Sequence, residues 1–310
     1  MTSPTVVELK NISKSFLNLQ ALRNVDFDLH EGETHALVGE NGAGKSTLMR
    51  ILAGIYNDYE GEYLLYGEEI HLQSPRDALN RGIGMIHQEL SVMPGLSVAE
   101  NLFLGRQILN RWGLVDWKTM YAQAEHELAE LGFNQLDVRK PLGEYPLGTQ
   151  QVVEVLRVMM SGAQVLVMDE PTTALSPAEV ERLVEFVDTL RQSKRSVIYI
   201  SHFLDEVMRI ADRITVLRDG LKIHTVEKKS TNVNELIASI LGREVEKHQP
   251  SESHRQQGET LLSVQNLSAD VFQDISFTLG KGEIIGIYGA IGAGHFDLAR
   301  AIFGMYRLDN

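Results

Sequence analysis

Nine consecutive residues have the types and spacing of a loop that holds phosphate groups. They are Gly39, Glu40, Asn41, Gly42, Ala43, Gly44, Lys45, Ser46 and Thr47, and they match the pattern G-x-x-x-x-G-K-[ST]. In such a loop the backbone N–H groups point at phosphate oxygens, Lys45 reaches the β- and γ-phosphates, and the Ser46 hydroxyl binds magnesium. We therefore expect a nucleoside triphosphate site.

Two adjacent carboxylates could complete the chemistry of that site. Asp169 and Glu170 follow the apolar run 165–168, which is typical of a strand buried on both faces. Carboxylates at the end of a buried strand are costly to desolvate unless a cation meets them, and a magnesium nucleotide would do so. We expect Asp169 to hold the metal and Glu170 to orient and deprotonate the attacking water.

The remaining candidates are polar residues at the ends of two other predicted strands. His202 follows the run 196–200, and Gln88 follows the run 83–87. Neither side chain indicates a site by itself, because such a histidine is commonly a surface residue and a lone glutamine is uninformative. His202 gains weight if its strand lies beside the strand that carries Asp169.

Predicted strands and helices alternate along the chain and position these residues. The strand 35–38 runs into the glycine-rich loop, and a helix follows until Gly54. This order predicts a parallel sheet with right-handed crossovers and ligands at the carboxyl ends of its strands. Ser176 and Glu179 form a capping box at the start of a further helix.

Two other regions lie outside this sheet. Short strands at 6–9 and 25–29, joined by a loop from Ser13 to Gln20, and strands at 63–66 and 70–72 predict an antiparallel layer. Residues 98–160 are predicted to be largely helical. Asp116 caps one helix, which ends at Gly132 and whose apolar positions are expected to share a buried face. These positions are Trp117, Met120, Tyr121, Ala124, Leu128 and Leu131.

The composition limits the function classes. The chain has 310 residues, which suggests two domains, and its formal net charge of −13 disfavours a nucleic acid partner. It has no cysteine, so disulfide frameworks are excluded. We find no signal peptide and no apolar run that could span a membrane, so we expect any membrane attachment to come through a partner.

A polar segment, 246–259, separates the first domain, 1–245, from a second region, 260–310, and is predicted to be a linker. The second region repeats the first at a spacing of 250 positions. The matching residues are Phe27, Gly32, Glu33, Gly39, Leu48 and Gly54 in the first copy and Phe277, Gly282, Glu283, Gly289, Leu298 and Gly304 in the second. We expect the second copy to be truncated, as in a piece of a longer protein.

The second glycine-rich loop lacks the residues that would bind phosphate and metal. His295 and Phe296 stand where the first copy has Lys45 and Ser46. We therefore expect this loop to bind nucleotide poorly.

Together these residues resemble the ATP-binding cassette (ABC) ATPases, and the tandem arrangement is similar to bacterial monosaccharide importers of the ribose, galactose or xylose type. The resemblance covers essentially the whole chain. The matching motifs are Walker A (Gly39–Thr47), Walker B (Val165–Pro171), the Q-loop (Gln88), the D-loop (Thr173–Ser176), the H-loop (Ser201–His202) and an adenine-stacking aromatic (Phe16).

The resemblance implies an α/β P-loop NTPase of ABC type, with a mixed central sheet, an antiparallel β subdomain and a helical subdomain at about 95–160. It implies ATP and Mg²⁺ as cofactors, Glu170, His202 and Gln88 as catalytic residues, and Ser46, Gln88 and Asp169 as metal ligands. It also implies a position at the cytoplasmic side of the bacterial membrane. The expected partners are permease subunits that dock near 88–105, indirectly a periplasmic or extracellular sugar-binding protein, and a second ABC domain or dimer partner.

One motif departs from the family. The signature Leu-Ser-Gly-Gly-Gln corresponds to Tyr145–Thr149, where only Gly148 remains and Pro146 replaces the serine. In ABC dimers each nucleotide site is a composite of the Walker A motif of one domain and the signature of the other. The damaged signature of the first domain would therefore share a site with the degenerate loop of the second domain. We expect one hydrolytic composite site and one structural site. Two alternatives are a non-catalytic truncated remnant and a soluble ABC ATPase of translation or DNA repair.

Overall fold

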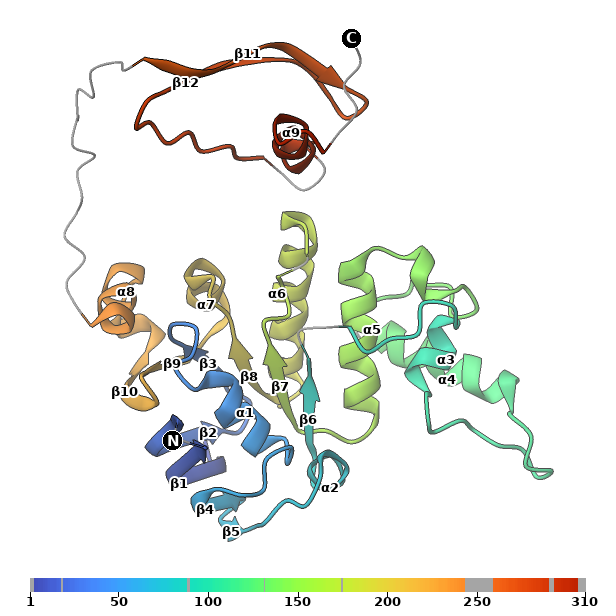
Figure 1. Ribbon diagram of the computed structural model, residues 1–310. Helices are drawn as coiled ribbons and strands as arrows, with labels where there is room; N and C mark the ends of the chain where they lie inside the picture. Colours follow the sequence, from blue (N-terminus) through green and yellow to red (C-terminus); the bar gives the residue numbers. More distant parts are fainter. Residues whose placement is uncertain are drawn as a thin grey trace. The chain divides into compact units, whose positions relative to one another are not determined.

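The computed structural model describes residues 3–17, 19–87, 90–130, 132–173, 175–242, 259–289 and 293–305. The chain divides into two compact units, Met1–Val245 and Glu246–Asn310 (Figure 1). The proposed linker at 246–259 lies outside the described residues except for Glu259. Among the described helices, none is long and apolar enough to cross a membrane.

The first unit is organised around a six-stranded sheet with the order β10-β9-β3-β8-β7-β6. Its strands are β3 (Thr34–Val38), β6 (Ile83–Ile86), β7 (Val165–Asp169), β8 (Ser196–Ile200), β9 (Arg213–Arg218) and β10 (Leu221–Glu227). The first five are parallel, as predicted, and β10 pairs antiparallel with β9. All residues of β3 and β8 are buried, because helices and a second sheet cover the two faces (Figure 1).

Alternate side chains of the central strands enter two different cores. Leu166 and Met168 of β7 pack in a core with the helices α3, α4, α5 and α6, whereas Val165 and Val167 pack in a core with α1 and the antiparallel sheet. The helices are α1 (Lys45–Leu52), α2 (Pro75–Asn80), α3 (Val98–Leu102), α4 (Trp117–Glu130), α5 (Leu147–Met160), α6 (Pro177–Gln192), α7 (Leu204–Ile210) and α8 (Val233–Leu241), with short 3₁₀ turns at Leu142–Glu144 and Lys228–Ser230. The sheet is thereby held rigidly between both layers.

The antiparallel layer exists, but its predicted boundaries were wrong. Its strands are β1 (Thr5–Phe16), β2 (Leu19–His30), β4 (Glu60–Leu65) and β5 (Glu68–Glu69), in the order β2-β1-β4-β5. The predicted loop from Ser13 to Gln20 is strand on both sides, with pairing that continues to Phe16 and Leu19. Antiparallel strands with an exposed face pair through the backbone and do not require apolar side chains. Residues 70–72 lie outside any strand.

The helical region confirms the predicted cap and corrects one buried position. The Asp116 carboxylate accepts a hydrogen bond from the Thr119 backbone N–H at 3.1 Å, at the start of α4. Met120, Ala124 and Leu128, spaced by four residues, are buried. Trp117 is 44% exposed, because the buried face is narrower than the pattern suggested. Leu131 lies outside the described residues.

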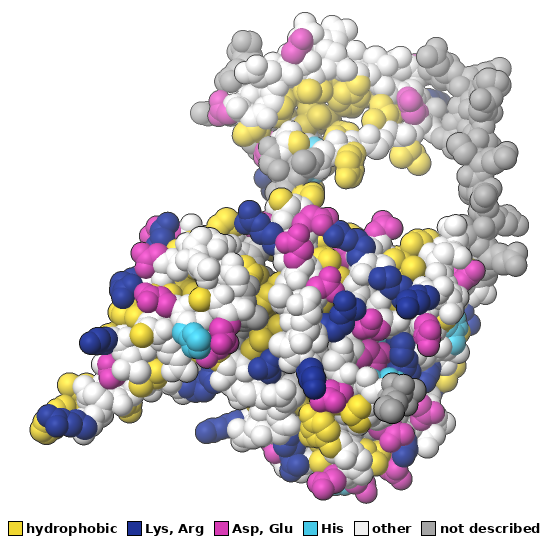
Figure 2. Space-filling view, turned by 180° about the vertical axis from the view of Figure 1, so that it is seen from behind, with side chains coloured by type: hydrophobic (Ala, Val, Ile, Leu, Met, Phe, Trp, Pro, Cys, Tyr) yellow, Lys and Arg dark blue, Asp and Glu magenta, His cyan; other side chains and the backbone are white. Residues whose placement is uncertain are grey.

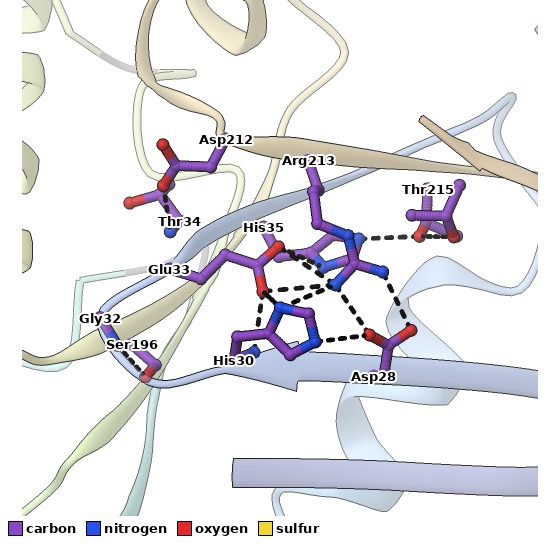
Figure 3. A network of polar contacts seen from close by, with 11 residues as sticks. Asp28, His30, Gly32, Glu33, Thr34, His35, Ser196, Asp212, Arg213 and Thr215 are labelled. Carbon is purple, nitrogen blue, oxygen red and sulfur yellow. Dashed lines mark hydrogen bonds and ion pairs between the residues drawn. The ribbon is translucent and has the colours of Figure 1, made fainter. Parts of the chain in front are cut away.

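A polar network at the amino ends of the central strands ties the two sheets together (Figure 3). Arg213 of β9 donates through both terminal nitrogens to Asp28 of β2, at 2.7 and 3.1 Å, and lies 3.4 Å from a Glu33 carboxylate oxygen. The fully buried His35 of β3 contacts Glu33 through Nδ1 at 3.1 Å and the Thr215 hydroxyl through Nε2 at 2.8 Å. The network therefore positions β3, from which the glycine-rich loop emerges.

Because of this network, we expect the free energy of unfolding to decrease in two stages as the pH is lowered. Burial lowers the pKa of His35, so only the unfolded chain takes up a proton there as the pH falls below the ordinary histidine pKa of 6.5. Burial opposes ionisation of Asp28 and Glu33, yet their pKa values are lowered, through Arg213 for Asp28 and chiefly through His35 for Glu33. These carboxylates therefore stabilise the fold above their ordinary pKa values, and that stability is lost below them.

Urea unfolding at about pH 7.5, 5.5 and 3.5 measures both stages. Arg213→Met is expected to reduce the second stage more than the first, since it removes the cation that holds Asp28 ionised. An unfolding midpoint that does not change over this range would contradict the assignment.

The second unit repeats local details of the first. Its elements are β11 (Thr260–Ala269), β12 (Phe272–Gly280) and α9 (His295–Ile302). Three backbone N–H groups, those of Asn266, Asp274 and Gly280, donate to Ser276, Ser268 and Glu283, as those of Asn11, Asn24 and His30 donate to Asp26, Ser13 and Glu33. Residues 284–288, which correspond to β3, form no strand, and Ile284 and Tyr288 are almost fully exposed.

Candidate nucleotide-binding site

The glycine-rich loop lies between the buried strand β3 and helix α1, as its sequence predicts. Two of its glycines pack too closely against backbone for any side chain. A Cβ on Gly39 would lie 2.2 Å from the Leu217 carbonyl oxygen, and one on Gly44 would lie 2.7 Å from the Ala21 carbonyl oxygen. Gly44 also has a φ of +100°, which favours glycine. Neighbouring β9 and β2 therefore dictate the tight turn.

The Lys45 ammonium lies inside this loop. Its Nζ donates to the carbonyl oxygens of Gly39 at 2.8 Å and Glu40 at 3.0 Å, and the residue is 6% exposed. Burial lowers the pKa of Lys45, and the opposing charges of Glu170 and Asp169 only partly offset it. The loop thus places the Lys45 ammonium next to residues 40–42, which are exposed.

The two acidic residues and the histidine meet at the carboxyl ends of neighbouring strands. Asp169 ends β7 in register with Ile200, the last residue of β8. Glu170 has a φ of +48°, and its N–H donates to the Ile200 carbonyl oxygen at 3.0 Å. Its carboxylate lies 3.4 Å from Nδ1 of His202. Burial, and next the charge of Glu170, raise the pKa of Asp169, so the site favours a cation there.

A cavity of about 400 Å³ adjoins the loop. It is lined by Phe16, Leu19, Gln20, Ala21, Arg23, Asn41, Gly42, Gly44, Lys45, Ser46, Thr47, Glu170, Asp219 and Gly220. Phe16 contributes a ring that is partly exposed and packs edge-on against Tyr56 at a centroid distance of 5.2 Å. The Lys14 ammonium lies 4.8 Å from the Phe16 ring. The structure thus brings Phe16, the loop and Glu170 to one cavity, whereas Gln88 lies outside the described residues.

The oxygen donors at this edge fit a hard divalent cation. Ser46 offers a hydroxyl and Asp169 a carboxylate, and Mg²⁺ commonly binds one or two such protein ligands together with nucleotide phosphates. No cluster of three or more His, Cys, Asp or Glu side chains that could hold a metal occurs among the described residues. The donor set therefore fits magnesium held together with a nucleotide.

No pattern in the sequence singles out Glu206, which links the carboxyl ends of β7 and β8. One oxygen of its carboxylate accepts hydrogen bonds from three buried hydroxyl groups, those of Thr172 at 2.9 Å, Tyr199 at 3.2 Å and Ser201 at 3.3 Å. Thr172 follows Glu170 after β7, and Ser201 precedes His202 after β8. The only signal in the sequence was an acidic residue in the first turn of a helix after His202.

We expect Glu206→Ala to lower the free energy of unfolding by about 1–3 kcal/mol, because it leaves three buried hydroxyl groups without their acceptor. Glu206→Gln keeps an acceptor oxygen and should cost less. Asp205→Asn is the matched control, since Asp205 is an exposed acid on the same helix turn. Urea unfolding of the three variants checks this, and equal losses in Glu206→Ala and Asp205→Asn would rule it out.

The one remaining signature residue contacts its own chain. The Gly148 N–H, in the first turn of α5, donates to the Glu179 carboxylate at 2.8 Å, and a Cβ on Gly148 would lie 2.7 Å from the Glu179 Cβ. The other Glu179 oxygen accepts from the Ser176 N–H and hydroxyl, which confirms the predicted capping box. Hydrogen bonds from Gly148 first, and then Ser176, lower the pKa of Glu179. Glu179 therefore joins the first turns of α5 and α6.

Comparison with known proteins agrees with this geometry. Residues 22–173 match the family model described as ABC transporter. The chain is 44% identical over 303 residues to a ribose import ATP-binding protein of Caldanaerobacter subterraneus, which covers 97% of this chain and 61% of that protein. It is 39% identical over 304 residues to the ribose import ATP-binding protein of Bacillus subtilis, with 98% and 61% covered. The chain thus spans about 61% of the length of these relatives.

Solved structures support the fold. A crystal structure of an ATP-binding cassette of an ABC transporter in its ADP conformation superimposes with a TM-score of 0.67 at 24% identity. It covers 77% of this chain and 99% of the solved chain. The fold class predicted from the sequence, an α/β P-loop NTPase of ABC type, is confirmed. With its glycine-rich loop, its paired carboxylates and the match over residues 22–173, the first unit of the chain contains an ATP-binding cassette domain of the ABC transporter family.

Proposed function

We propose that this chain is the ATP-binding and ATP-hydrolysing part of an importer that moves a monosaccharide through a membrane permease. The observation that carries the proposal is the meeting of Lys45, Glu170 and His202 at the carboxyl ends of β3, β7 and β8. The names of the relatives, which are ribose import ATP-binding proteins, support the transport role. We place the chain at the cytoplasmic side of the bacterial membrane.

The residues of the site take separate roles in this proposal. Backbone N–H groups of residues 39–47 and the Lys45 ammonium bind the nucleotide phosphates, and Phe16 stacks on adenine. Magnesium, when bound, neutralises phosphate charge. Ser46, Gln88 and Asp169 would hold it.

Glu170, His202 and Gln88 take the roles that concern the attacking water and the γ-phosphate. Glu170 orients the attacking water and takes its proton, and His202 and Gln88 contact the γ-phosphate side. Burial, and then the neighbouring charge of Glu170, raise the pKa of Asp169, and this supports a cation as the partner of that carboxylate. The 3.4 Å contact between Glu170 and His202 supports a shared role for these two side chains.

We also propose the following arrangement of domains. Residues 1–245 form one complete ABC domain with a helical subdomain at about 95–160, residues 246–259 form a linker, and residues 260–310 begin a degenerate second domain. The equivalent hydrogen bonds that occur inside each unit support the repeat. The partners are permease subunits, a second ABC domain or dimer partner and, indirectly, a sugar-binding protein. The names of the relatives favour import over a role in translation, in DNA repair or as a remnant.

The 310-residue chain by itself is expected to bind Mg-ATP but to hydrolyse it slowly. Its own signature has Pro146 in place of serine, and the Gly148 N–H is already held by Glu179, so a homodimer would offer no intact signature. Phosphate release by the purified chain measures this. Turnover as fast as that of an assembled transporter would refute it.

Sugar uptake tests the proposed function. Cells that lack the gene would be complemented with the natural protein or with its Glu170→Gln variant, and uptake of labelled ribose and other monosaccharides would be measured. We expect uptake only with the natural protein. Equal uptake with both would exclude ATP-driven transport by this site, and uptake of no monosaccharide would exclude the importer role.

A further inference from the structure

A projecting loop between α3 and α4, residues 105–116, exposes large apolar side chains. Leu109 is 58% exposed, Trp112 74% and Leu114 66%. Hydrophobic and basic side chains gather at the end of this projection (Figure 2). The chain has two tryptophans, and the second, Trp117, follows the loop directly and is 44% exposed. Isolated apolar residues are normal on a surface, but a concentration at one tip marks an interaction site.

Hydrogen bonds hold these side chains outward. The Asn110 side-chain oxygen accepts from the N–H groups of Trp112 at 2.8 Å and Leu114 at 3.1 Å, and the Asn110 N–H donates to the Leu114 carbonyl oxygen at 2.7 Å. At the base of the loop, Ile108 and Val115 pack against the core. The loop is therefore an ordered turn whose inner residues anchor it and whose outer residues stay accessible.

The charge of the tip is opposite to that of the chain. Residues 105–115 contain Arg106 and Arg111 and no acidic residue, although the chain carries a net charge of −13. Arg106 donates to the Arg157 and Met160 carbonyl oxygens and is tied to the body of the unit. Arg111 is the cation of the tip, and its guanidinium lies 5.0 Å from the centre of the Trp112 ring.

The acidic residue at the base of the loop is already engaged. The Asp116 carboxylate accepts from the N–H and the hydroxyl of Thr119, at 3.1 and 2.9 Å, and so caps α4. Lys118 is exposed on the first turn of that helix and adds a second cation close to the loop. The loop and the helix turn after it therefore expose two tryptophan rings and two leucines, with Arg111 and Lys118 as exposed cations and the capping Asp116 as the single acidic residue.

We propose that the tip formed by Leu109, Arg111, Trp112 and Leu114 inserts into the interface of a bilayer that contains anionic lipids. Tryptophan rings favour the headgroup level of a membrane, leucines the acyl boundary, and arginine an anionic surface. This proposal goes beyond the proposed function, which requires only contact with a permease. A negative result for membrane binding would leave the proposed function unaffected.

Tryptophan fluorescence of the 310-residue chain tests the proposal directly, because both tryptophans lie at or beside the tip. Vesicles of phosphatidylglycerol and phosphatidylethanolamine should shift the emission to shorter wavelength, and vesicles of phosphatidylcholine should do so much less. Binding should be weak and reversible, on the order of the 10⁴ M⁻¹ of a single acyl chain. Cosedimentation with the same vesicles gives an independent measure.

Three variants that keep both tryptophans sharpen the test. Arg111→Glu is expected to weaken binding to anionic vesicles about tenfold, and the double variant Leu109→Ser, Leu114→Ser at least about tenfold. Leu241→Ser, which removes an exposed leucine from α8, is the matched control and should bind like the natural chain. ATP binding, measured in parallel, should be the same in all of them, because no tip residue lines the nucleotide cavity.

Two outcomes would overturn the proposal. The first is an emission spectrum that protein-free anionic vesicles leave unchanged, including the case in which only vesicles with permease shift it, since the tip would then contact protein. The second is equal vesicle binding by the natural chain and the tip variants, since another surface would then hold the membrane.

Discussion

Replacing Lys45 by alanine should weaken ATP binding to this chain by a hundredfold or more. The Lys45 ammonium is nearly buried, and its two carbonyl partners hold it inside the loop at the centre of the phosphate site. Truncating one partner of a buried, hydrogen-bonded charge pair costs about 2–5 kcal/mol, and about 2.7 kcal/mol corresponds to a hundredfold loss. Titration of the purified chain with a fluorescent ATP analogue measures the change.

The control for this variant separates binding from folding. Lys140→Ala removes a partly exposed lysine whose ammonium contacts Glu144 and the Tyr145 ring, outside the nucleotide cavity, and it should bind ATP normally. Urea unfolding should show that Lys45→Ala is still folded, because the side chain belongs to the loop and not to either apolar core. ATP binding within threefold of the natural chain would show that Lys45 does not hold the phosphates.

Glu170→Gln is expected to slow ATP hydrolysis by the assembled transporter at least a hundredfold while ATP binding changes little. General base catalysis contributes about 10²–10⁴-fold, and an amide cannot accept the proton of the attacking water. The substitution keeps the size of the side chain and leaves the backbone at φ +48° unaltered. It also removes a negative charge beside Asp169 and Lys45, so binding should be retained or tightened.

Pre-steady-state measurements in the assembled transporter distinguish the two effects. Asp205→Asn is again the control, since Asp205 lies near His202 in sequence but is exposed and contributes nothing to the cavity. If Glu170→Gln hydrolysed ATP at the natural rate, the base would have to be another group. If it lost ATP binding instead, Glu170 would be part of the binding site and not of the chemistry.

Together, Glu206 and Glu179 show how this fold uses acidic residues outside its motifs. Glu206 joins the ends of β7 and β8 through three hydroxyl groups, and Glu179 joins the first turns of α5 and α6. The Glu206 partners Thr172 and Ser201 lie within two residues of Glu170 and His202 in the chain. The site is thereby supported by side chains whose partners are distant in the chain.

Local sequence determined the elements of the site. The loop from Gly39 to Thr47, the strand that ends at Asp169 and the capping box at Ser176 follow from patterns within a few residues, because glycine turns, apolar runs and helix caps depend on near neighbours. The repeat and its altered residues at His295 and Phe296 were also visible in the chain itself.

Tertiary structure alone decided what depends on distant partners. The pairing of β1 and β2 extends through polar residues that composition suggested were a loop, since a backbone ladder is stabilised by the facing strand. The close approach of Gly39 to Leu217 and the three hydroxyl groups on Glu206 are likewise contacts across the sheet. Such contacts carry no signature in local sequence, because they depend on which strands the fold places side by side.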